Sequence, residues 1–399
     1  MRVMLVHCRY LQRGGEDTVF EAETALLAER GVETLPYTVS NEELLHVSPL
    51  TQAFYTIWNR HQASRLASVA RSFRPDVVHF HNTFPFMSPA VLLAAKEARA
   101  ATVQTLHNYR LLCPAATFYR DGHVCEDCLP HSVPWPSVRF GCYRDSRAAS
   151  AGVAAMLATH RLFGTYRRFV DRFIAPTAFV RGKFVSAGFA PEKVSIKPHF
   201  LSTDPALGEG EGGYVLFVGR LSRGKGIGTL LEAWKSGISA PLRIVGDGPL
   251  REAVASAVAE SHNMTWLGPL GRTEVIEQMR GAALLVFPTE FYETFGMVAI
   301  EAFATGLPVV APDHGAVAEV VRDGVTGALF RPGDPGDLRA KVEGLLADPE
   351  RILRMRVSAR REYSEKYTAD RNFQALMGIY EAAVRDYQRS RRARGDSYA

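Results

Sequence analysis

Two short segments carry charged residues at spacings that suit a ligand with both phosphates and hydroxyls. Residues 219–226 read G-R-L-S-R-G-K-G and place Arg220 and Lys225 on a loop after an apolar run. Residues 293–301 read E-T-F-G-M-V-A-I-E and place two carboxylates on either side of a glycine where a helix is expected to begin. Cations bind phosphate, and carboxylates accept hydrogen bonds from sugar hydroxyls. The two segments together favour a sugar attached to a nucleoside diphosphate.

The first segment matches most of the phosphate-loop pattern G-x-x-x-x-G-K-[ST], but Gly226 stands where that pattern has a hydroxyl. The hydroxyl binds magnesium in nucleoside triphosphatases, so its absence argues against ATP hydrolysis. In the second segment, a helix start near residues 295–297 would offer backbone amides to an anion, and Gly296 would allow close approach. The alternatives are a flexible turn with two solvated cations and, for Glu301, an internal salt bridge.

The elements that position these residues alternate between short apolar runs and amphipathic stretches, which is typical of parallel strands joined by helices. Strands are predicted at 3–7, 33–39, 76–80, 102–106 and 173–175, with helices after Gly14 and near 49–72, 88–99 and 147–170. A second series has strands at 214–218, 242–245, 264–267, 283–287, 308–311 and 327–330 and helices near 227–236, 249–260, 272–280, 296–305, 335–347, 350–363 and 370–389.

The length of 399 residues exceeds the roughly 250–300 residues at which a single core stops growing. We therefore predict two domains, at 1–205 and 206–367, and a C-terminal helical segment at 368–399. Ligands of parallel α/β sheets bind outside the carboxyl ends of the strands. A cleft between the two domains is therefore the expected binding site.

The sequence resembles the retaining glycosyltransferases of the GT-B fold, in the large group called family four. The resemblance rests on G-R-L-x-x-x-K-G followed by E-x-F-G-x-x-x-x-E, with G-D-G-P at 246–249 and W-L-G at 266–268 between them. It covers nearly the whole chain and is strongest at 214–331. It implies an α/β architecture of two Rossmann-like domains whose parallel sheets face a central cleft, with a C-terminal helix that crosses back to the first domain.

The resemblance also implies roles for the donor-side residues. Arg220 and Lys225 would hold the donor diphosphate and stabilise its charge on departure without a metal. Glu301 would bind the ribose. Gly219 belongs to the same site, as does Gly268 in the loop after Trp266, which would meet the base through its backbone. The donor sugar would be held by Glu293 and by the amides of Phe295, Gly296, Met297 and Val298.

The first domain is expected to supply the acceptor side. Gly14 and Gly15 lie at a strand-to-helix turn, where their amides can approach the donor phosphates. His107 ends a predicted strand, and the resemblance implies that it acts near the transferred sugar. His79 and His81 are expected to alternate across their strand, so that only one faces the cleft. We favour His81, with Asn82, as the acceptor contact.

Four of the five cysteines lie in the segment 108–143, which interrupts the α/β rhythm. The two-residue gap between Cys125 and Cys128 is that of a zinc knuckle, and Cys113 and Cys142 could complete a tetrahedron. Free thiols and disulfides are the alternatives to a structural zinc. This insert is a departure from the family pattern, and its place directly after the His107 strand suggests that it shapes acceptor choice.

We therefore predict a hexosyltransferase that moves a sugar from a nucleotide-diphosphate sugar to a saccharide or lipid-linked saccharide, in cell-envelope or exopolysaccharide biosynthesis. It would require no catalytic cofactor beyond this co-substrate. A nucleotide-sugar epimerase on the same fold and a non-catalytic nucleotide-sugar-binding protein are the alternatives. The residues name neither the donor sugar nor the acceptor, and they do not set the oligomeric state.

No apolar run approaches the roughly 18 residues of a membrane span, and the N-terminal run is too short for a signal peptide. We expect a cytoplasmic protein whose membrane contact is peripheral, at the inner face of the plasma membrane. Between residues 138 and 172, seven arginines stand against two aspartates. They form either a solvated face or a surface for an anionic membrane or phosphate-bearing acceptor. No nucleic-acid motif accompanies them, so nucleic acid is not an expected partner.

Overall fold

The computed structural model describes residues 1–393 and divides the chain into two compact units. The first contains residues 1–117, 126–198 and the C-terminal segment from Asn372, and the second contains Phe118–Cys125 and His199–Arg371. The divisions fall at 198/199 and 371/372, a few residues from the boundaries expected at 205 and 367. The last residues of the expected C-terminal segment, 394–399, lie outside the described residues.

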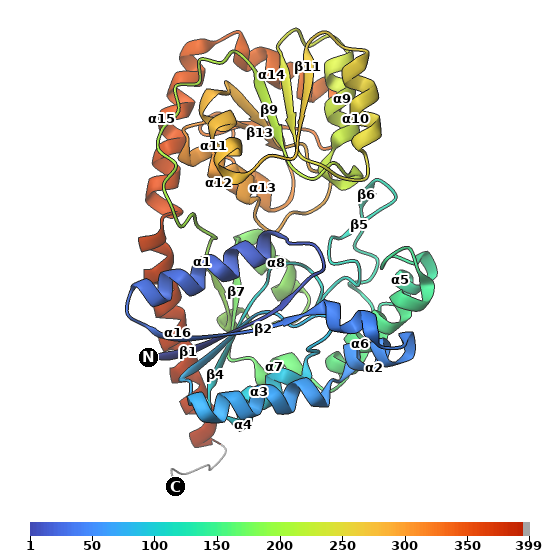
Figure 1. Cartoon of the computed structure of the whole chain (residues 1–399), viewed down its shortest axis with the longest axis vertical. Coiled ribbons are helices and arrows are strands. Elements are labelled where there is room, and N and C mark those ends of the chain that lie inside the picture. The colour runs from blue at the N-terminus through green and yellow to red at the C-terminus, as the bar shows by residue number, and fades with distance from the viewer. Residues whose placement is uncertain (394–399) are drawn as a thin grey trace. The chain divides into compact units, whose positions relative to one another are not determined.

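The first unit is built from strands and helices that alternate along the chain (Figure 1). Its strands are β1 (Arg2–Arg9), β2 (Glu33–Ser40), β3 (Val77–Asn82), β4 (Ala101–Thr105), β7 (Arg172–Ala175) and β8 (Val194–Ile196). Its helices are α1 (Gly15–Glu29), η1 (Asn41–His46), α2 (Pro49–Ile57), α3 (Arg60–Phe73), α4 (Ala90–Glu97), α5 (Trp135–Phe140), α6 (Arg147–Leu162), α7 (Thr165–Phe169), α8 (Ala178–Ser186) and η2 (Pro191–Lys193), with most of α16 (Ala369–Ala393).

The sheet of the first unit is parallel, with strand order β2-β1-β3-β4-β7-β8. The order reverses between β1 and β3, so the loops after these two strands leave in different directions and open a binding position at the carboxyl edge. One core cluster joins Leu5 of β1 and Phe20 of α1 to Leu376 and Tyr380 of α16. The C-terminal helix is thus part of the first unit's core, and Figure 1 shows α3 and α4 on the opposite side of this sheet from α1.

The second unit contains a second parallel sheet and a separate two-stranded hairpin. The sheet strands are β9 (Val215–Val218), β10 (Leu242–Val245), β11 (Met264–Gly268), β12 (Leu284–Val286), β13 (Val309–Pro312) and β14 (Gly327–Phe330), and the hairpin strands are β5 (Tyr119–Arg120) and β6 (His123–Val124). The helices are η3 (Arg223–Lys225), α9 (Ile227–Lys235), α10 (Arg251–Ala259), α11 (Arg272–Gly281), α12 (Met297–Ala304), α13 (Gly315–Val320), α14 (Pro335–Leu346) and α15 (Pro349–Lys366).

The second sheet has the order β11-β10-β9-β12-β13-β14, which reverses between β9 and β12. Its two faces bury separate clusters of apolar side chains. One contains Phe303 of α12 and Tyr363 of α15, and the other contains Trp234 of α9 and Leu338 of α14. Strands buried on both faces read as continuous apolar runs, which explains why the sequence predicted them within a residue or two. Within residues 1–393, no helix is long and apolar enough to cross a bilayer.

Candidate functional site

The loops that follow β9 and β12 form the candidate site of the second unit. They leave neighbouring strands at the point where the strand order reverses, which is where parallel sheets of this kind bind ligands. The loop after β9 carries the two predicted cations and ends in η3, and the loop after β12 carries Glu293 before α12 begins at Met297. The topology alone therefore brings two charged segments together that lie far apart in the sequence.

Lys225 and Glu293 form an ion pair between these two loops. The Lys225 ammonium also lies 5.1 Å from the Phe291 ring centroid and 5.7 Å from that of Phe287. The Thr289 hydroxyl lies 3.2 Å from the Gly224 carbonyl oxygen and 3.4 Å from Glu293 Oε1. Contacts from both loops therefore hold Lys225 and Glu293 next to each other. A phosphate that entered this site would compete with Glu293 for Lys225.

Glycine is required where these loops pass close to other backbone. Gly226 has φ +72°, and a Cβ there would lie 1.8 Å from the Pro288 carbonyl oxygen. Gly246 has φ +136°, and a Cβ there would lie 1.9 Å from the Gly219 carbonyl oxygen. No other residue type fits such contacts without moving the backbone. The glycines thus bring the loops after β9, β10 and β12 within touching distance, and Trp266 Nε1 donates to the Gly246 carbonyl at 2.9 Å.

Arg220 and Glu301 occupy different environments within the same unit. Arg220 is exposed, and its guanidinium has no ion-pair partner among the residues that the structure describes. Glu301 lies inside α12, where burial raises the pKa of its carboxyl and the nearby Arg272 partly offsets that rise. Within residues 1–393 Glu301 forms no ion pair, so it is not joined to Lys225 as Glu293 is. Arg220 lies on the loop after β9, and an exposed guanidinium at this position could bind a phosphate.

The remaining residues predicted for the donor side are glycines, one buried phenylalanine and the first residues of α12. Phe295 is buried in the core of the second unit and packs on the rings of His199 and Tyr367, so only its backbone can meet a ligand. Gly296 caps α12 with φ +93°, and Met297 begins the helix, as predicted. Val298 follows in its first turn, where amides lack helical acceptors. Gly219 and Gly268 lie in the adjoining loops after β9 and at the end of β11.

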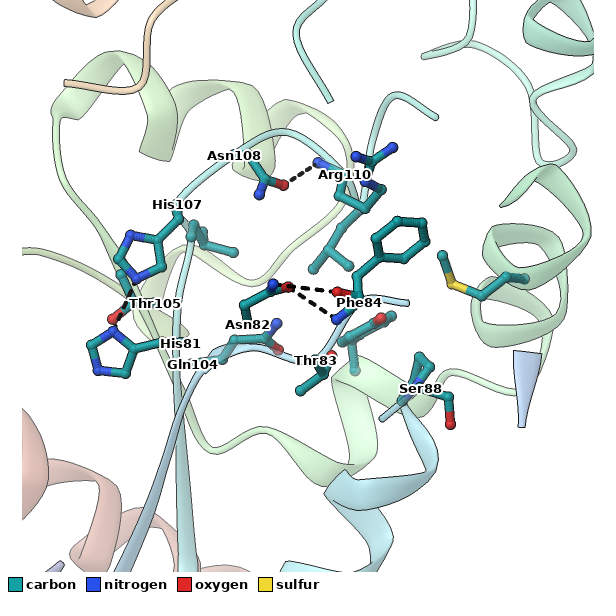
Figure 2. A pocket seen from close by; sticks show the side chains of 15 residues that line it. His81, Asn82, Thr83, Phe84, Ser88, Gln104, Thr105, His107, Asn108 and Arg110 are labelled. Carbon is teal, nitrogen blue, oxygen red and sulfur yellow. Dashed lines mark hydrogen bonds between the residues drawn. The ribbon is translucent and has the colours of Figure 1, made fainter. Parts of the chain in front are cut away.

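In the first unit, His81 and His107 face each other at the ends of β3 and β4 (Figure 2). His81 Nδ1 lies 3.0 Å from His107 Nε2, and the two rings are stacked with centroids 5.2 Å apart. They line an open hollow with Asn82, Gln104 and Arg110 among others. Its volume is about 40 Å³, which is enough to hold water.

Asn82 is engaged at both ends of its side chain. Its Nδ2 donates to the Cys8 carbonyl at 2.7 Å, and its Oδ1 accepts from the Phe84 amide at 2.9 Å. These bonds fix the turn after β3 beside the end of β1. A role for Asn82 as an acceptor contact stays a prediction, and these internal bonds weaken it.

His79 and His81 share one face of β3, so the expectation that they alternate across the strand is wrong, although of the two only His81 lines the hollow. Residues two apart in a strand point the same way, and the two ring centroids lie 4.3 Å apart. Burial lowers the pKa of His79 to about 3, with Lys197 adding to the effect, and burial likewise lowers the pKa of His81. Both imidazoles are therefore neutral at physiological pH.

Beneath these histidines lies a buried ion pair that the sequence analysis did not predict. Lys197 Nζ is 2.5 Å from Glu23 Oε1, and both side chains are almost wholly buried. Glu23 Oε2 lies 3.6 Å from His81 Nε2, and neither atom makes a hydrogen bond within the described residues. The result is a chain of polar groups that runs from Lys197 through Glu23 and His81 to His107.

The ligand atoms of Glu23, His79 and His81 lie within 4.8 Å of one another, an arrangement that could hold a metal ion. Lys197 already supplies a positive charge to the carboxylate. His79 has partners on both ring nitrogens, the Tyr380 hydroxyl at 2.8 Å and the Thr105 hydroxyl at 2.8 Å. The cluster therefore fits an ion-paired hydrogen-bond network better than a metal site.

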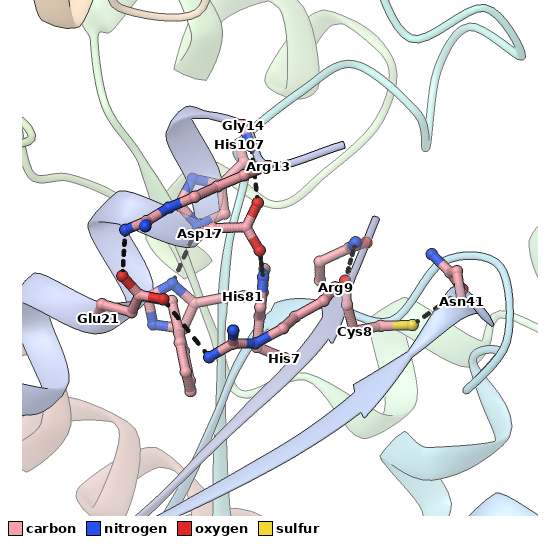
Figure 3. A network of polar contacts seen from close by, with 12 residues as sticks. His7, Cys8, Arg9, Arg13, Gly14, Asp17, Glu21, Asn41, His81 and His107 are labelled. Carbon is pink, nitrogen blue, oxygen red and sulfur yellow. Dashed lines mark hydrogen bonds and ion pairs between the residues drawn. The ribbon is translucent and has the colours of Figure 1, made fainter. Parts of the chain in front are cut away.

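The start of α1 is tied to β1 through Asp17 (Figure 3). Asp17 Oδ1 lies 2.9 Å from His7 Nε2, and Asp17 Oδ2 accepts from the Gly14 amide at 2.8 Å. The amide of Gly14 is thus committed within the protein, whereas the space around the Gly15 Cα is open. Of the two glycines predicted to approach a phosphate, Gly15 is the one whose surroundings leave room for it.

Comparisons with known proteins agree with this architecture. The family model described as "Glycosyltransferase Family 4" matches residues 11–204, and the model described as "Glycosyl transferases group 1" matches residues 212–348. Together the two models match most of the chain, so the chain belongs to the glycosyltransferases. The Anabaena protein Alr3699/HepE, solved in complex with UDP-glucose, superposes with a TM-score of 0.65 over 96% of this chain and 100% of that chain at 17% identity.

Two relatives found by sequence comparison each match less than half of the chain. An uncharacterized glycosyltransferase of Methanocaldococcus jannaschii, MJ1178, is 33% identical over 43% of this chain and 49% of its own length. A D-inositol 3-phosphate glycosyltransferase of Mycolicibacterium vanbaalenii is 32% identical over 41% of this chain and 34% of its own length. The chain thus spans less than half the length of these relatives.

Arg161 of α6 joins two segments of the cysteine-rich insert at 108–143. Arg161 of α6 donates to the carbonyls of Leu111, Leu112, His131 and Ser132 at 2.8 to 3.4 Å. All five cysteines of the chain are thiols rather than disulfide partners in the described residues. Cys113 and Cys128 are buried, and Cys125 and Cys142 are half-buried. A zinc ion held by these four residues stays a prediction.

Glu23 and Lys197, which the sequence analysis did not single out, carry at most a weak signal in the sequence. Glu23 lies in the apolar stripe of α1 with Phe20, Leu26 and Leu27. A carboxylate in such a stripe needs a partner, so this position could have been recognised as part of a buried network. Lys197 follows β8, a strand that was not predicted, and its pairing with Glu23 depends on the tertiary fold.

Proposed function

We propose that this chain is a retaining glycosyltransferase that moves a hexosyl group from a nucleotide-diphosphate sugar. The proposal rests above all on the pairing of Lys225 with Glu293 at the switch point of the second sheet, beside the exposed Arg220. A phosphate-binding cation and a hydroxyl-binding carboxylate in contact suit a ligand with both groups. The likeness to a protein solved with UDP-glucose supports a nucleotide sugar as the co-substrate.

The charges indicate how the reaction would proceed. As the bond between the anomeric carbon and the phosphate oxygen breaks, negative charge develops on the departing diphosphate, and Arg220, Lys225 and the amides at the start of α12 stabilise it. We propose that the acceptor oxygen attacks from the same face and that its proton passes to the departing phosphate. Glu293 would hold the sugar hydroxyls and Glu301 the ribose.

The first unit would bind the acceptor. His107 is assigned to the transferred sugar, and His81, the neutral imidazole 3.0 Å away, would hold its ring in place. Glu23 lies behind His81, with its Oε2 3.6 Å from His81 Nε2, and would place a negative charge beside that ring.

A lipid-linked saccharide is the acceptor class that the surface of the first unit favours. A hollow of about 400 Å³ lies among η1, α2 and α6 and is lined largely by apolar side chains, including Leu44, Leu50 and Val153, with Arg144 among them. Leu50 and Phe54 of α2 are exposed. Apolar side chains next to basic ones suit a lipid whose head group carries phosphate, which supports a role in envelope or exopolysaccharide assembly at the membrane surface.

A donor screen tests the proposal. Purified protein would be titrated with a panel of nucleotide sugars by calorimetry, and release of the nucleoside diphosphate would be followed with and without lipid-linked saccharides. We expect binding of at least one donor and release that depends on acceptor. Release or sugar interconversion without acceptor would favour an epimerase, and binding without turnover would favour a non-catalytic binding protein.

Arg220→Ala should lower turnover about 100-fold or more, because one preorganised charge facing the leaving group is worth roughly that factor. The matched control is Arg251→Ala, which removes an exposed arginine at the start of α10 in the same unit. Unchanged turnover in Arg220→Ala would overturn the assignment of this residue.

A further inference from the structure

The hairpin of the cysteine-rich insert belongs to the second unit, although the segments before and after it belong to the first. Its strands β5 and β6 pair Tyr119 with Val124 and Arg120 with His123. The turn between them, Asp121 and Gly122, has φ +52° and +83°, which is the turn chemistry that a two-residue hairpin requires. The hairpin is thus a locally specified element that presents its side chains to the second unit.

Phe118 and Tyr119 pack against the loop that follows β12. Phe118 is fully buried, and its ring lies 6.5 Å from that of Tyr292. The Tyr119 ring lies 6.5 Å from that of Phe291, which in turn contacts the Lys225 ammonium. A Cβ on Gly224 would lie 3.0 Å from Phe291 and 3.7 Å from Tyr119. The hairpin therefore covers the loop that carries the donor-side cations.

Glu290 joins the hairpin to both donor-side loops. Its Oε2 accepts from the Tyr119 hydroxyl at 2.7 Å, and its Oε1 accepts from the Thr229 hydroxyl of α9 at 2.8 Å. Its backbone amide donates to the Gly224 carbonyl at 2.9 Å. One residue thus holds together the insert, the helix after the cation loop and the cation loop itself, three positions before Glu293.

We propose that Tyr119 is a positioning residue for the nucleotide-sugar site and that the insert governs donor affinity through it. Tyr119 holds the Glu290 carboxylate, which sets the path of residues 289–293 and of Gly224. It thereby holds Lys225 and Glu293 at the positions where a donor would meet them. This inference rests on the proposed function. It assigns the insert a part on the donor side, where the sequence suggested the acceptor side alone.

Tyr119→Phe removes the hydroxyl and leaves the ring contact with Phe291. A hydrogen bond to a carboxylate contributes on the order of a tenfold change in an equilibrium. Because this bond acts through Glu290, we expect the donor dissociation constant to rise about three- to tenfold, with the acceptor KM and the melting temperature unchanged. His123→Ala, on the exposed side of the same hairpin, is the control and should leave donor binding unchanged.

A double-mutant cycle with Glu290→Gln separates positioning from a general structural effect. The two substitutions disrupt the same contact, so the losses in donor affinity should be less than additive. Additive losses, an unchanged donor dissociation constant in Tyr119→Phe, or an equal loss in His123→Ala would each overturn the inference. Failure of the wild-type protein to bind any nucleotide sugar would instead overturn the proposed function.

Discussion

Charged side chains in both units are neutralised by partners held in place by backbone geometry. Lys225 pairs with Glu293, Lys197 with Glu23, and His7 contacts Asp17. The Lys197 pair is buried, and removing one partner from a buried pair leaves an uncompensated charge that costs several kcal/mol. The Lys225 pair is partly exposed, so a ligand can exchange for it at lower cost. The same kind of ion pair therefore supports the fold in the first unit and would serve the proposed binding in the second.

Glu16 is a carboxyl whose environment predicts a measurable pH dependence of stability. Burial raises its pKa to about 8 from a usual value of 4.5, with Asp17 adding to the rise and Arg110 opposing it. Tyr10 and Cys8 are the other titratable groups that interact with it. Between pH 4.5 and 8 the folded chain keeps a proton that the unfolded chain releases, so this group makes stability fall as pH rises through that window.

Glu16→Gln cannot lose a proton, so we expect its melting temperature to exceed that of the wild type by a margin that grows from about pH 5 to about pH 9. Thermal denaturation at several pH values measures this margin. The control is Glu29→Gln, an exposed position at the end of the same helix, for which the margin should stay flat. A flat margin for Glu16→Gln as well would contradict the assignment.

The sequence predicted a site residue where its role depends on neighbours in the same short segment. It did not predict residues whose partners lie far away in the sequence. Lys225, Glu293 and the start of α12 follow from short segments whose loops and glycines are visible in the sequence. The contact of His81 with Glu23 joins β3 to α1, and Tyr119 meets Glu290 across 171 positions of the chain. No local periodicity encodes such pairs.

At the scale of elements, most strands lie where the apolar runs predicted them. Two stretches predicted as single helices are each broken into two. The stretch 49–72 is two helices, because Trp58 is extended and the Asn59 side chain caps α3 by accepting from the Gln62 amide. The stretch 147–170 is also two helices, because Gly164 adopts φ +61° between α6 and α7. Each break depends on one cap or one glycine within a continuous amphipathic pattern.

The four cysteines of the insert lead to a prediction about metal. Metal analysis of purified protein should give about one zinc per chain, as a four-thiolate structural site requires. Cys125→Ser with Cys128→Ser should remove the metal and lower the melting temperature. Cys8→Ala, which removes a buried thiol of β1 that donates to Asn41 at 3.1 Å, should retain it. Less than about a tenth of an equivalent in the wild type would exclude the site.

At the scale of the whole chain, each unit has its own sheet and core, and the chain crosses between them more than once. Residues 118–125 leave the first unit for the second, and the chain returns to the first unit at Asn372. Leu376, Tyr380 and Ala383 of α16 complete the apolar cluster of β1 and α1. The family resemblance predicted that the C-terminal helix returns to the first unit. No sequence pattern predicted that the hairpin at 118–125 belongs to the second unit.

The apolar side chains exposed on α2 lead to a prediction about membrane contact. Leu50 is 85% exposed and Phe54 is 64% exposed, four residues apart on one helix face. Burying each side chain in a bilayer interface is worth about 2 kcal/mol, and the arginines between 138 and 172 add attraction to anionic lipid. We expect the protein to sediment with anionic vesicles at low salt and to be released as salt increases.

Leu50→Asp with Phe54→Asp should weaken this vesicle binding about 100-fold or more, since two apolar contacts are lost and two negative charges face the lipid. The chain offers a matched control in Leu353→Asp with Val357→Asp, because these residues are also exposed and four apart, but lie on α15 of the second unit. If the control pair lost as much binding as the α2 pair, the effect would be one of net charge, and α2 would not be the membrane contact. Retained binding in the α2 variant would lead to the same conclusion.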